Sequence, residues 1–194
     1  MGKTFFISDL HFGHKNVLAF DNREFPSIEA HDEALIRNWN EAVGIDDDVW
    51  ILGDISWHGP MKTVEILKQL NGVKHLCIGN HDYKLLRSRD VRACFAEITP
   101  YREIEVDGWG VVLCHYPIPC YNKHFYGWIH LYGHVHSGME WNMMKQVQYQ
   151  MKALYDSPCH LYNVGCMIPG MDYTPRTLQE ILNNRYQEED ESGT

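Results

Sequence analysis

The sequence has few basic residues and no long apolar run. Lysine and arginine total 17 against 26 aspartate and glutamate residues, which leaves a formal charge of −9. Because proteins that grip long nucleic acids rely on clustered basic side chains, this balance argues against such a protein. No apolar stretch approaches the length of a membrane span, and the N-terminus shows no secretory signal. We therefore expect a soluble, cytoplasmic protein with no membrane partner.

The cysteines lack the spacing of a metal-binding or redox motif. None forms a C-x-x-C pair or a zinc-ribbon pattern. Without a secretory signal, free and mostly buried thiols in a reducing compartment are favoured over disulfides. The six residues concerned are Cys77, Cys94, Cys114, Cys120, Cys159 and Cys166.

The chain has the size and composition of one folded domain. It has 194 residues, of which 44% are hydrophobic and 12% aromatic. This is enough apolar surface for a sizeable core, which excludes a wholly disordered chain. We predict a single domain over residues 1–186 and an acidic, frayed tail over residues 187–194. Histidine is unusually frequent, with 12 copies.

The first half of the chain alternates strand-like and helix-like segments. Short apolar runs predict strands, whereas apolar residues at helical spacing behind a capping residue or a proline predict helices. An alternating β-α-β-α-β order implies a parallel sheet covered by helices. The predicted strands are residues 3–8, 48–52 and 74–78, and the predicted helices are residues 27–43 and 60–70.

The second half is richer in strands. Residues 102–114 predict a hairpin around Asp107-Gly108, a dipeptide that favours tight turns. Further strands are predicted at 128–132 and 160–164, and a last helix at 174–184. The Met-rich segment 137–155 is compatible with a helix.

Polar residues with metal-binding chemistry follow five of the predicted strands. Since the carboxyl ends of strands in an α/β sheet share one crevice, we expect these side chains to meet there. Carboxylate and amide oxygens together with imidazoles suit Mn, Fe or Zn better than Ca or Mg. Seven ligands exceed the need of one tetrahedral ion, but two sites sharing a carboxylate would use them all. The candidates are Asp9, His11, Asp54, Asn80, His115, His134 and His136.

The order of these motifs resembles that of the calcineurin-like metallophosphoesterase superfamily, in particular its small bacterial and phage phosphoesterases. The motifs are D-x-H (residues 9–11), G-D (53–54), G-N-H-D (79–82), a single histidine (115) and G-H-x-H (133–136). Together they span about two thirds of the chain. The resemblance implies an α/β fold, a four-layer α/β/β/α sandwich of two mixed sheets flanked by helices.

The resemblance also implies two metal sites that share one carboxylate. Asp9, His11 and His136 would hold the first ion. Asn80, His115 and His134 would hold the second. Asp54 would bridge the two ions.

One motif histidine has no ligand role in the superfamily pattern. His81 would face the scissile phosphate, where it would stabilise developing charge or protonate the leaving oxygen. Asp82 would orient and charge it.

Several histidines and one arginine lie outside these motifs. His14, Arg23 and His58 are candidates for contact with substrate. His31, between polar neighbours on a predicted helix, is expected to be exposed. The remaining histidines are interpreted as structural or surface residues, namely His75, His124, His130 and His160.

The function that follows is a metal-dependent phosphoesterase, a hydrolase of a small phosphodiester or phosphomonoester. Two divalent ions (Mn, Fe or Zn, with Mn preferred for assay) would act as cofactors, and a hydroxide bridging them would attack phosphorus. The first alternative is a nuclease, for which DNA or RNA would be the substrate. The second is a metal-bearing scaffold without turnover, against which the intact Asn80, His81 and His115 argue.

Overall fold

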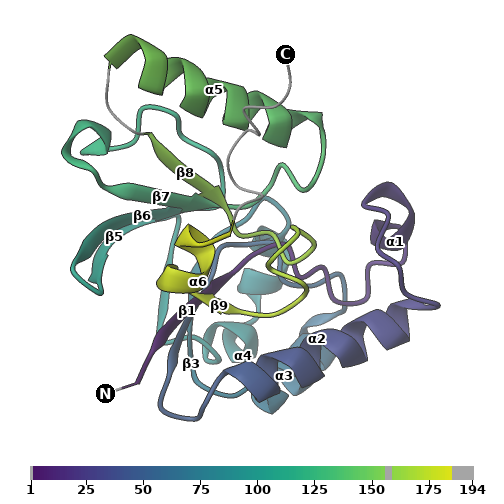
Figure 1. Ribbon diagram of the computed structural model, residues 1–194. Helices are drawn as coiled ribbons and strands as arrows, with labels where there is room; N and C mark the ends of the chain where they lie inside the picture. The colour runs from purple at the N-terminus through teal and green to yellow at the C-terminus, as the bar shows by residue number, and fades with distance from the viewer. Residues whose placement is uncertain (1, 156–158, 185–194) are drawn as a thin grey trace.

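Two mixed β-sheets lie face to face, with helices on their outer faces (Figure 1). The computed structural model describes residues 2–155 and 159–184. One sheet has five strands in the order β4-β3-β2-β1-β9, and the other has four in the order β5-β6-β7-β8. The predicted layered α/β architecture is therefore confirmed.

The first sheet consists mainly of parallel strands from the first half of the chain. Its apolar runs, such as Phe5-Phe6-Ile7, are buried because helices and the second sheet cover both faces. Strands β1 to β4 pair in parallel, and β9 pairs antiparallel with β1. Their bounds are β1 (Thr4–Ile7), β2 (Asp48–Ile51), β3 (Val73–Cys77), β4 (Glu97–Thr99) and β9 (Arg176–Thr177).

Two longer helices cover the outer face of this sheet. Helix α2 (Ile28–Ala42) begins where the Ser27 hydroxyl accepts the backbone N–H of Ala30, as predicted. Helix α3 (Pro60–Gln69) begins with proline in its first turn. Shorter helical segments follow β1 and β3, namely α1 (Val17–Phe20), η1 (Asp82–Arg87) and α4 (Arg89–Arg92).

The second sheet begins with the predicted hairpin. Asp107 and Gly108 have φ values of 51° and 82°, the left-handed conformation that a two-residue hairpin turn requires. Helix α5 (Met139–Tyr155) lies over this sheet and contacts β8 (Figure 1). The strands are β5 (Tyr101–Val106), β6 (Trp109–Cys114), β7 (Ile129–Tyr132) and β8 (His160–Asn163), with η2 (His124–Tyr126) before β7.

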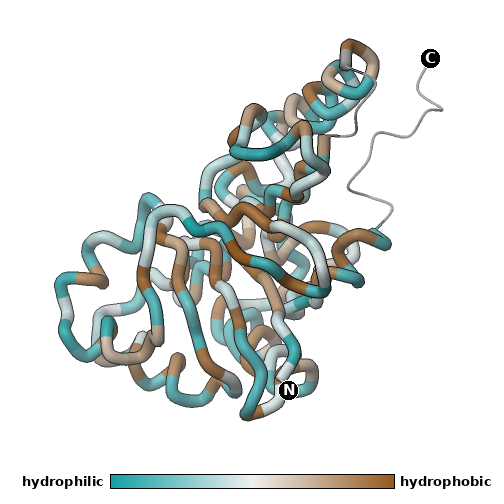
Figure 2. Tube along the Cα trace, turned by 90° about the vertical axis from the view of Figure 1, so that its left-hand side faces the viewer, coloured by the Kyte–Doolittle hydropathy of each residue, from teal (hydrophilic) through white to brown (hydrophobic). Residues whose placement is uncertain are grey.

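The main hydrophobic core fills the space between the sheets and beneath α2 and α3. It includes Phe6 and Ile51 from the first sheet, Leu113 and Leu131 from the second, and Trp39 from α2. Figure 2 shows hydrophobic residues along the strands in the middle of the molecule. All six cysteines are free and most are buried, as predicted. Within the described ranges, no helix is both long and apolar enough to cross a bilayer.

The C-terminal helix begins later than the sequence predicted. Residues 176–177 form β9, and α6 spans Leu178–Leu182. The dipeptide Thr174-Pro175 predicts an earlier start, but the start signal is Thr177, whose side chain forms a capping box with Glu180. The predicted acidic tail, and the domain end at residue 186, lie outside the described residues.

Candidate metal centre

The predicted ligands gather where five strands end. Asp9 follows β1, Asp54 follows β2 and Asn80 follows β3. His115 directly follows β6, and the His134–His136 segment follows β7. Because β1, β2 and β3 are parallel, as are β6 and β7, the carboxyl ends of both sheets open on one crevice.

Five of these residues have a left-handed backbone, which side chains other than glycine seldom adopt. Such conformations are strained and tend to cluster where a site requires a particular side-chain direction. Here each one turns the chain sharply just after a strand. Their φ values are 55° at Asp9, 51° at His11, 56° at Asp54, 71° at His134 and 50° at His136.

Glycines allow the strand-end loops to approach one another closely. A Cβ atom at Gly79 would lie 2.3 Å from Oδ1 of Asp54. At Gly53, which has a φ of 90°, a Cβ would lie 2.5 Å from Nδ1 of His115. Neither contact is sterically possible, so the G-D and G-N-H-D motifs need their glycines for packing around the centre.

One group of possible ligands consists of Asp9, His11 and His136, whose donor atoms lie within 4.8 Å of one another. The Nε2 atoms of His11 and His136 are 3.2 Å apart. Nε2 of His136 is 3.7 Å from Oδ1 of Asp9. The Asp9 carboxylate also accepts the backbone N–H of His134, which fixes the G-H-x-H loop against β1.

A second group consists of Asp9, Asp54 and His115. Oδ2 of Asp54 lies 3.6 Å from Nε2 of His115 and 3.9 Å from Nε2 of His11, between imidazoles assigned to different ions. Asp9, rather than Asp54, is common to both groups. The predicted bridging role of Asp54 thus remains a proposal, supported by its position between the two imidazoles.

Asn80 and His134 are the two remaining predicted ligands. Oδ1 of Asn80 lies 3.0 Å from Nε2 of His115, which places the amide at the second group. His134 is exposed and belongs to neither group, although its ring centroid lies 5.0 Å from that of His115. The structure therefore brings six predicted ligands into direct contact and places the His134 ring at their edge.

Hydrogen bonds set which ring nitrogens face the crevice. Nδ1 of His115 lies 2.7 Å from the Leu52 carbonyl oxygen, so it carries the proton and leaves a lone pair on Nε2. Nδ1 of His136 donates in the same way to Asp21. The free lone pairs then point at Asp54, Asn80 and Asp9, which are also acceptors. When hydrogen-bond acceptor atoms face one another in this way, a cation between them satisfies their lone pairs.

The charge balance points to the same conclusion. Asp9 and Asp54 are 0% and 2% exposed, and the groups within ion-pair distance of them in the described ranges are imidazoles. Burial and the neighbouring Asp9 carboxylate raise the pKa of Asp54 to about 6, although His115 opposes this. Burial lowers the pKa of His11 well below its usual value, so this imidazole is neutral. Two buried carboxylates whose ion-pair neighbours are imidazoles suit divalent cations, so the residues present fit the metals that the motifs imply.

The structure gives Arg23 a different role from the predicted contact with substrate. The side chain is 2% exposed, and its guanidinium donates to Asp21 and to the backbone carbonyl of Asp9. It also lies 2.9 Å from Nε2 of His31. Arg23 thus supports the loop behind the centre. The prediction that His31 is exposed is wrong, because its ring is buried between Arg23 and Asp32.

Asp82 also differs from its predicted role. Its carboxylate accepts the backbone N–H groups of Gly79, Asp54 and Ile55. The side chain is fully buried, and in the described part of the chain it bonds these backbone groups rather than the His81 ring. Asp82 therefore ties the Gly79 loop to the Asp54 loop. Spacing suggested a partner for His81, but the turn after β3 directs the carboxylate inward.

His81 lies at the open side of the centre among other aromatic rings. Its side chain is 47% exposed, and Nε2 lies 3.9 Å from Oδ2 of Asp54. Its backbone N–H donates to Oδ1 of Asp54, and its ring packs 4.3 Å from that of Trp57. Trp57 also stacks on His14 at 4.0 Å. His81 thus lies within reach of a phosphate that metal ions held by the carboxylates would bind.

His14 and His58 lie beside the centre rather than in it. The centroid of the His14 ring lies 5.5 Å from that of His11. Burial lowers the pKa of His14, and the neighbouring His81 adds to this effect. Nε2 of His58 lies 3.1 Å from Asp32, whose carboxylate also accepts the Gly13 backbone N–H. His58 therefore braces the loop that carries His11 and His14.

Three comparisons place the chain among known proteins. It is 37% identical to the uncharacterized protein MJ1445 of Methanocaldococcus jannaschii over 139 residues, which cover 71% of each chain. It is 32% identical to the gene 66 protein of Mycobacterium phage L5, over 72% of this chain and 80% of that protein. The chain belongs to the family of these proteins. No protein-family model matches it.

Solved structures support the fold of this MJ1445 family. A protein of unknown function from Aquifex aeolicus, AQ665, matches 93% of this chain and 98% of its own, with a TM-score of 0.70 and 26% identity. Pseudomonas putida nuclease MPE and the Escherichia coli phosphoesterase Yfce each match 69% of the chain at 19% identity. Their TM-scores of 0.41 and 0.35 are too low to support a conclusion, so function must be inferred from the site itself.

Three residues that matter to the site were not predicted from the sequence. Asp21 orients His136, Trp57 packs on His81 and His14, and the Asn163 amide donates to the His136 carbonyl oxygen. Asn163 ends β8, so its position at a strand end was a usable signal. Asp21 and Trp57 lie in loops, where sequence spacing does not reveal such contacts.

Proposed function

We propose that this protein is a metal-dependent phosphoesterase that uses two divalent ions to hydrolyse a small phosphodiester or phosphomonoester. The observation that carries the proposal is the convergence of acceptor atoms: imidazole lone pairs of His115 and His136 face the oxygens of Asp54, Asn80 and Asp9. Two ions bound there would neutralise charge on a phosphate and lower the pKa of the attacking water.

The chain's own residues would divide the remaining work. Asp9, His11 and His136 would hold one ion and Asn80, His115 and His134 the other, with Asp54 between them. Asp21 would keep the His136 ring in its binding orientation. His81, exposed at the crevice, would hold a proton on its imidazole and give it to the leaving oxygen as the ester bond breaks.

Turnover of bis(p-nitrophenyl) phosphate by the purified protein tests this proposal. Protein freed of metal with a chelator should be inactive, and added Mn²⁺ should restore turnover. Absence of turnover under saturating Mn²⁺, Fe²⁺ and Zn²⁺, in protein that binds these ions, would favour the non-catalytic scaffold.

The size of the substrate needs a separate test. The net charge of −9 disfavours a polymer, which would need several phosphate contacts to bind at physiological salt. Hydrolysis of a dinucleotide should therefore compete well with that of long single- or double-stranded DNA. If long DNA is cleaved with far higher efficiency, and that advantage falls steeply with salt, the protein is a nuclease.

A further inference from the structure

A crevice adjoins Asn80 and His81 beside the proposed metal centre. Its volume is about 820 Å³, within the ~300–1,000 Å³ range of sites that hold small ligands. Asn80 and His81 line one end of it, so it opens directly beside the proposed centre. A single phosphate would leave most of this volume empty, so the crevice has room for a larger group.

The charge of the crevice differs from that of the whole protein. Lys84 and Arg87 line it, and none of the described residues that line it is acidic. Neither cation takes part in an ion pair in the described part of the chain. Both side chains are exposed on η1, immediately after the G-N-H-D motif. In a chain of net charge −9, two unpaired cations beside the site provide a local attraction for an anion.

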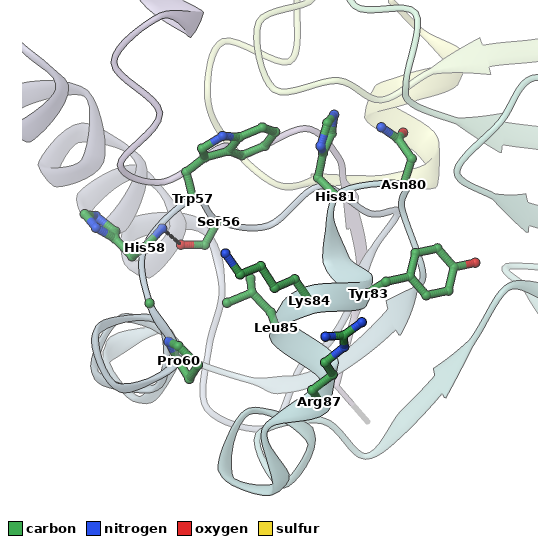
Figure 3. A pocket seen from close by; sticks show the side chains of 11 residues that line it. Ser56, Trp57, His58, Pro60, Asn80, His81, Tyr83, Lys84, Leu85 and Arg87 are labelled. Atoms are coloured by element: carbon green, nitrogen blue, oxygen red, sulfur yellow. Dashed lines mark hydrogen bonds between the residues drawn. The ribbon is translucent and has the colours of Figure 1, made fainter.

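The crevice also offers aromatic surface. Trp57 and Tyr83 line it, and their exposed fractions are 40% and 62%. Figure 3 shows Lys84 crossing the middle of the crevice, with Trp57 and His81 at one end and Arg87 at the other. Aromatic rings next to cations bind a ligand that joins a planar ring to a phosphate.

We propose that this crevice binds the leaving group of the substrate and that this group is a nucleotide with a second phosphate. The base would pack against Trp57 or Tyr83, and its own phosphate would lie between Lys84 and Arg87. In the reaction, water adds its oxygen to the scissile phosphorus and releases a proton to solvent. The bond to the nucleotide oxygen breaks, and that oxygen takes a proton from His81, which solvent then replaces. This inference rests on the proposed function and specifies its substrate.

Binding without turnover provides the first test. The metal-free protein should bind the dinucleotide pTpT or TpTp, which carry a terminal phosphate, at least about tenfold more tightly than TpT by isothermal titration calorimetry. Lys84→Ala and Arg87→Ala should each remove about tenfold of that preference. Lys152→Ala, which removes an exposed cation on α5 far along the chain, should retain it. Equal binding of all three dinucleotides would overturn the inference.

Turnover provides the second test and separates the two proposals. With Mn²⁺, at least one of pTpT and TpTp should be hydrolysed with a kcat/KM about tenfold above that of TpT, mainly through a lower KM. Lys84→Ala should reduce this ratio and Lys152→Ala should preserve it. Loss of all turnover with the binding preference intact would reject the phosphoesterase but retain the nucleotide site. Hydrolysis of bis(p-nitrophenyl) phosphate with no preference among the dinucleotides would retain the phosphoesterase and reject the nucleotide site.

Discussion

The Asp21 carboxylate lies 2.7 Å from Nδ1 of His136, while Arg23 holds the same carboxylate from behind at 2.8 Å. Although burial opposes it, the hydrogen bond to Asp21 contributes to a raised pKa of His136. The bond also leaves Nε2 of His136 directed at Asp9 and His11. The proposed metal site thus depends on Asp21, which is not one of the predicted ligands and which bonds His136 and Arg23.

Replacing Asp21 should weaken one metal site without removing a ligand. Asp21→Asn should lower Mn²⁺ affinity by about 10–100-fold, since the ring loses its fixed tautomer and part of its basicity. Asp90→Asn, a change at an exposed aspartate on α4, should leave the affinity unchanged. Titration of metal-free protein with Mn²⁺ measures this, and equal affinities for the two variants would contradict the positioning role.

Removing His81 should reduce turnover but not metal content. His81→Asn should lower kcat by about 10²–10⁴-fold for an alkyl ester, because the leaving oxygen loses its proton donor. The loss should be smaller for p-nitrophenyl esters, whose leaving group needs little protonation. His124→Asn, outside the site, is the matched control. Equal losses for both ester types would assign His81 to charge stabilisation, and metal loss would contradict its role altogether.

Asp54 should matter most among the ligands, because its carboxylate lies within 4 Å of imidazoles from both proposed sites. Asp54→Asn should abolish most metal binding and turnover, whereas His134→Asn should leave part of the binding. The thermal stabilisation that saturating Mn²⁺ gives the parent protein should likewise vanish in Asp54→Asn. Near-normal metal content in Asp54→Asn would show that Asp9 alone joins the two sites.

A histidine outside the centre should control stability at acidic pH. Burial lowers the pKa of His130 to about 4, although the nearby Val112 and Tyr116 carbonyl oxygens oppose this. In the neutral ring, Nδ1 donates to the Val112 carbonyl and Nε2 accepts the Ile118 N–H. The unfolded chain takes up this proton at higher pH, near 6.5. Stability from the neutral ring is therefore complete above pH 6.5 and is lost as the pH falls toward 4.

Chemical denaturation of metal-free protein at pH 7.5 and pH 5 measures this loss. His130 should contribute about 2 kcal/mol to the drop in unfolding free energy between these values. His130→Gln should be less stable at pH 7.5 and should show a correspondingly smaller drop. An identical drop in both proteins would mean that His130 takes up its proton in the folded state.

The sequence predicted those parts of the fold that local patterns determine. Apolar runs located β1 and β2, and Ser27 and Pro60 located the starts of α2 and α3. The strand β9 was not predicted, because its two residues form a strand only by pairing with β1, which is distant in the sequence. The helix after it was misplaced because proline and a threonine cap both signal a start, and Thr177 provides the capping box.

The candidate site, too, could be predicted where local patterns determine it and not where tertiary contacts do. The sequence predicts that residues at strand ends lie close together, because the topology of the sheet determines where its strands end. Spacing predicts that Asp82 orients His81 and that Arg23 contacts substrate. In the structure, Asp82 accepts backbone N–H groups and Arg23 donates to Asp21 and to the Asp9 carbonyl.

Net charge averages over the chain and does not reveal a local basic segment such as residues 84–92. Helix η1 places Lys84 and Arg87 of this segment at the crevice.

The central claim is that two ions held by this ligand set perform the hydrolysis. It is tested most directly by measuring bis(p-nitrophenyl) phosphate turnover and bound Mn²⁺ in the same equilibrium dialysis samples. Bound metal should saturate near two ions per chain, and turnover should rise mainly as the second ion binds. Saturation at one ion or none, or full turnover with a single ion bound, would contradict it.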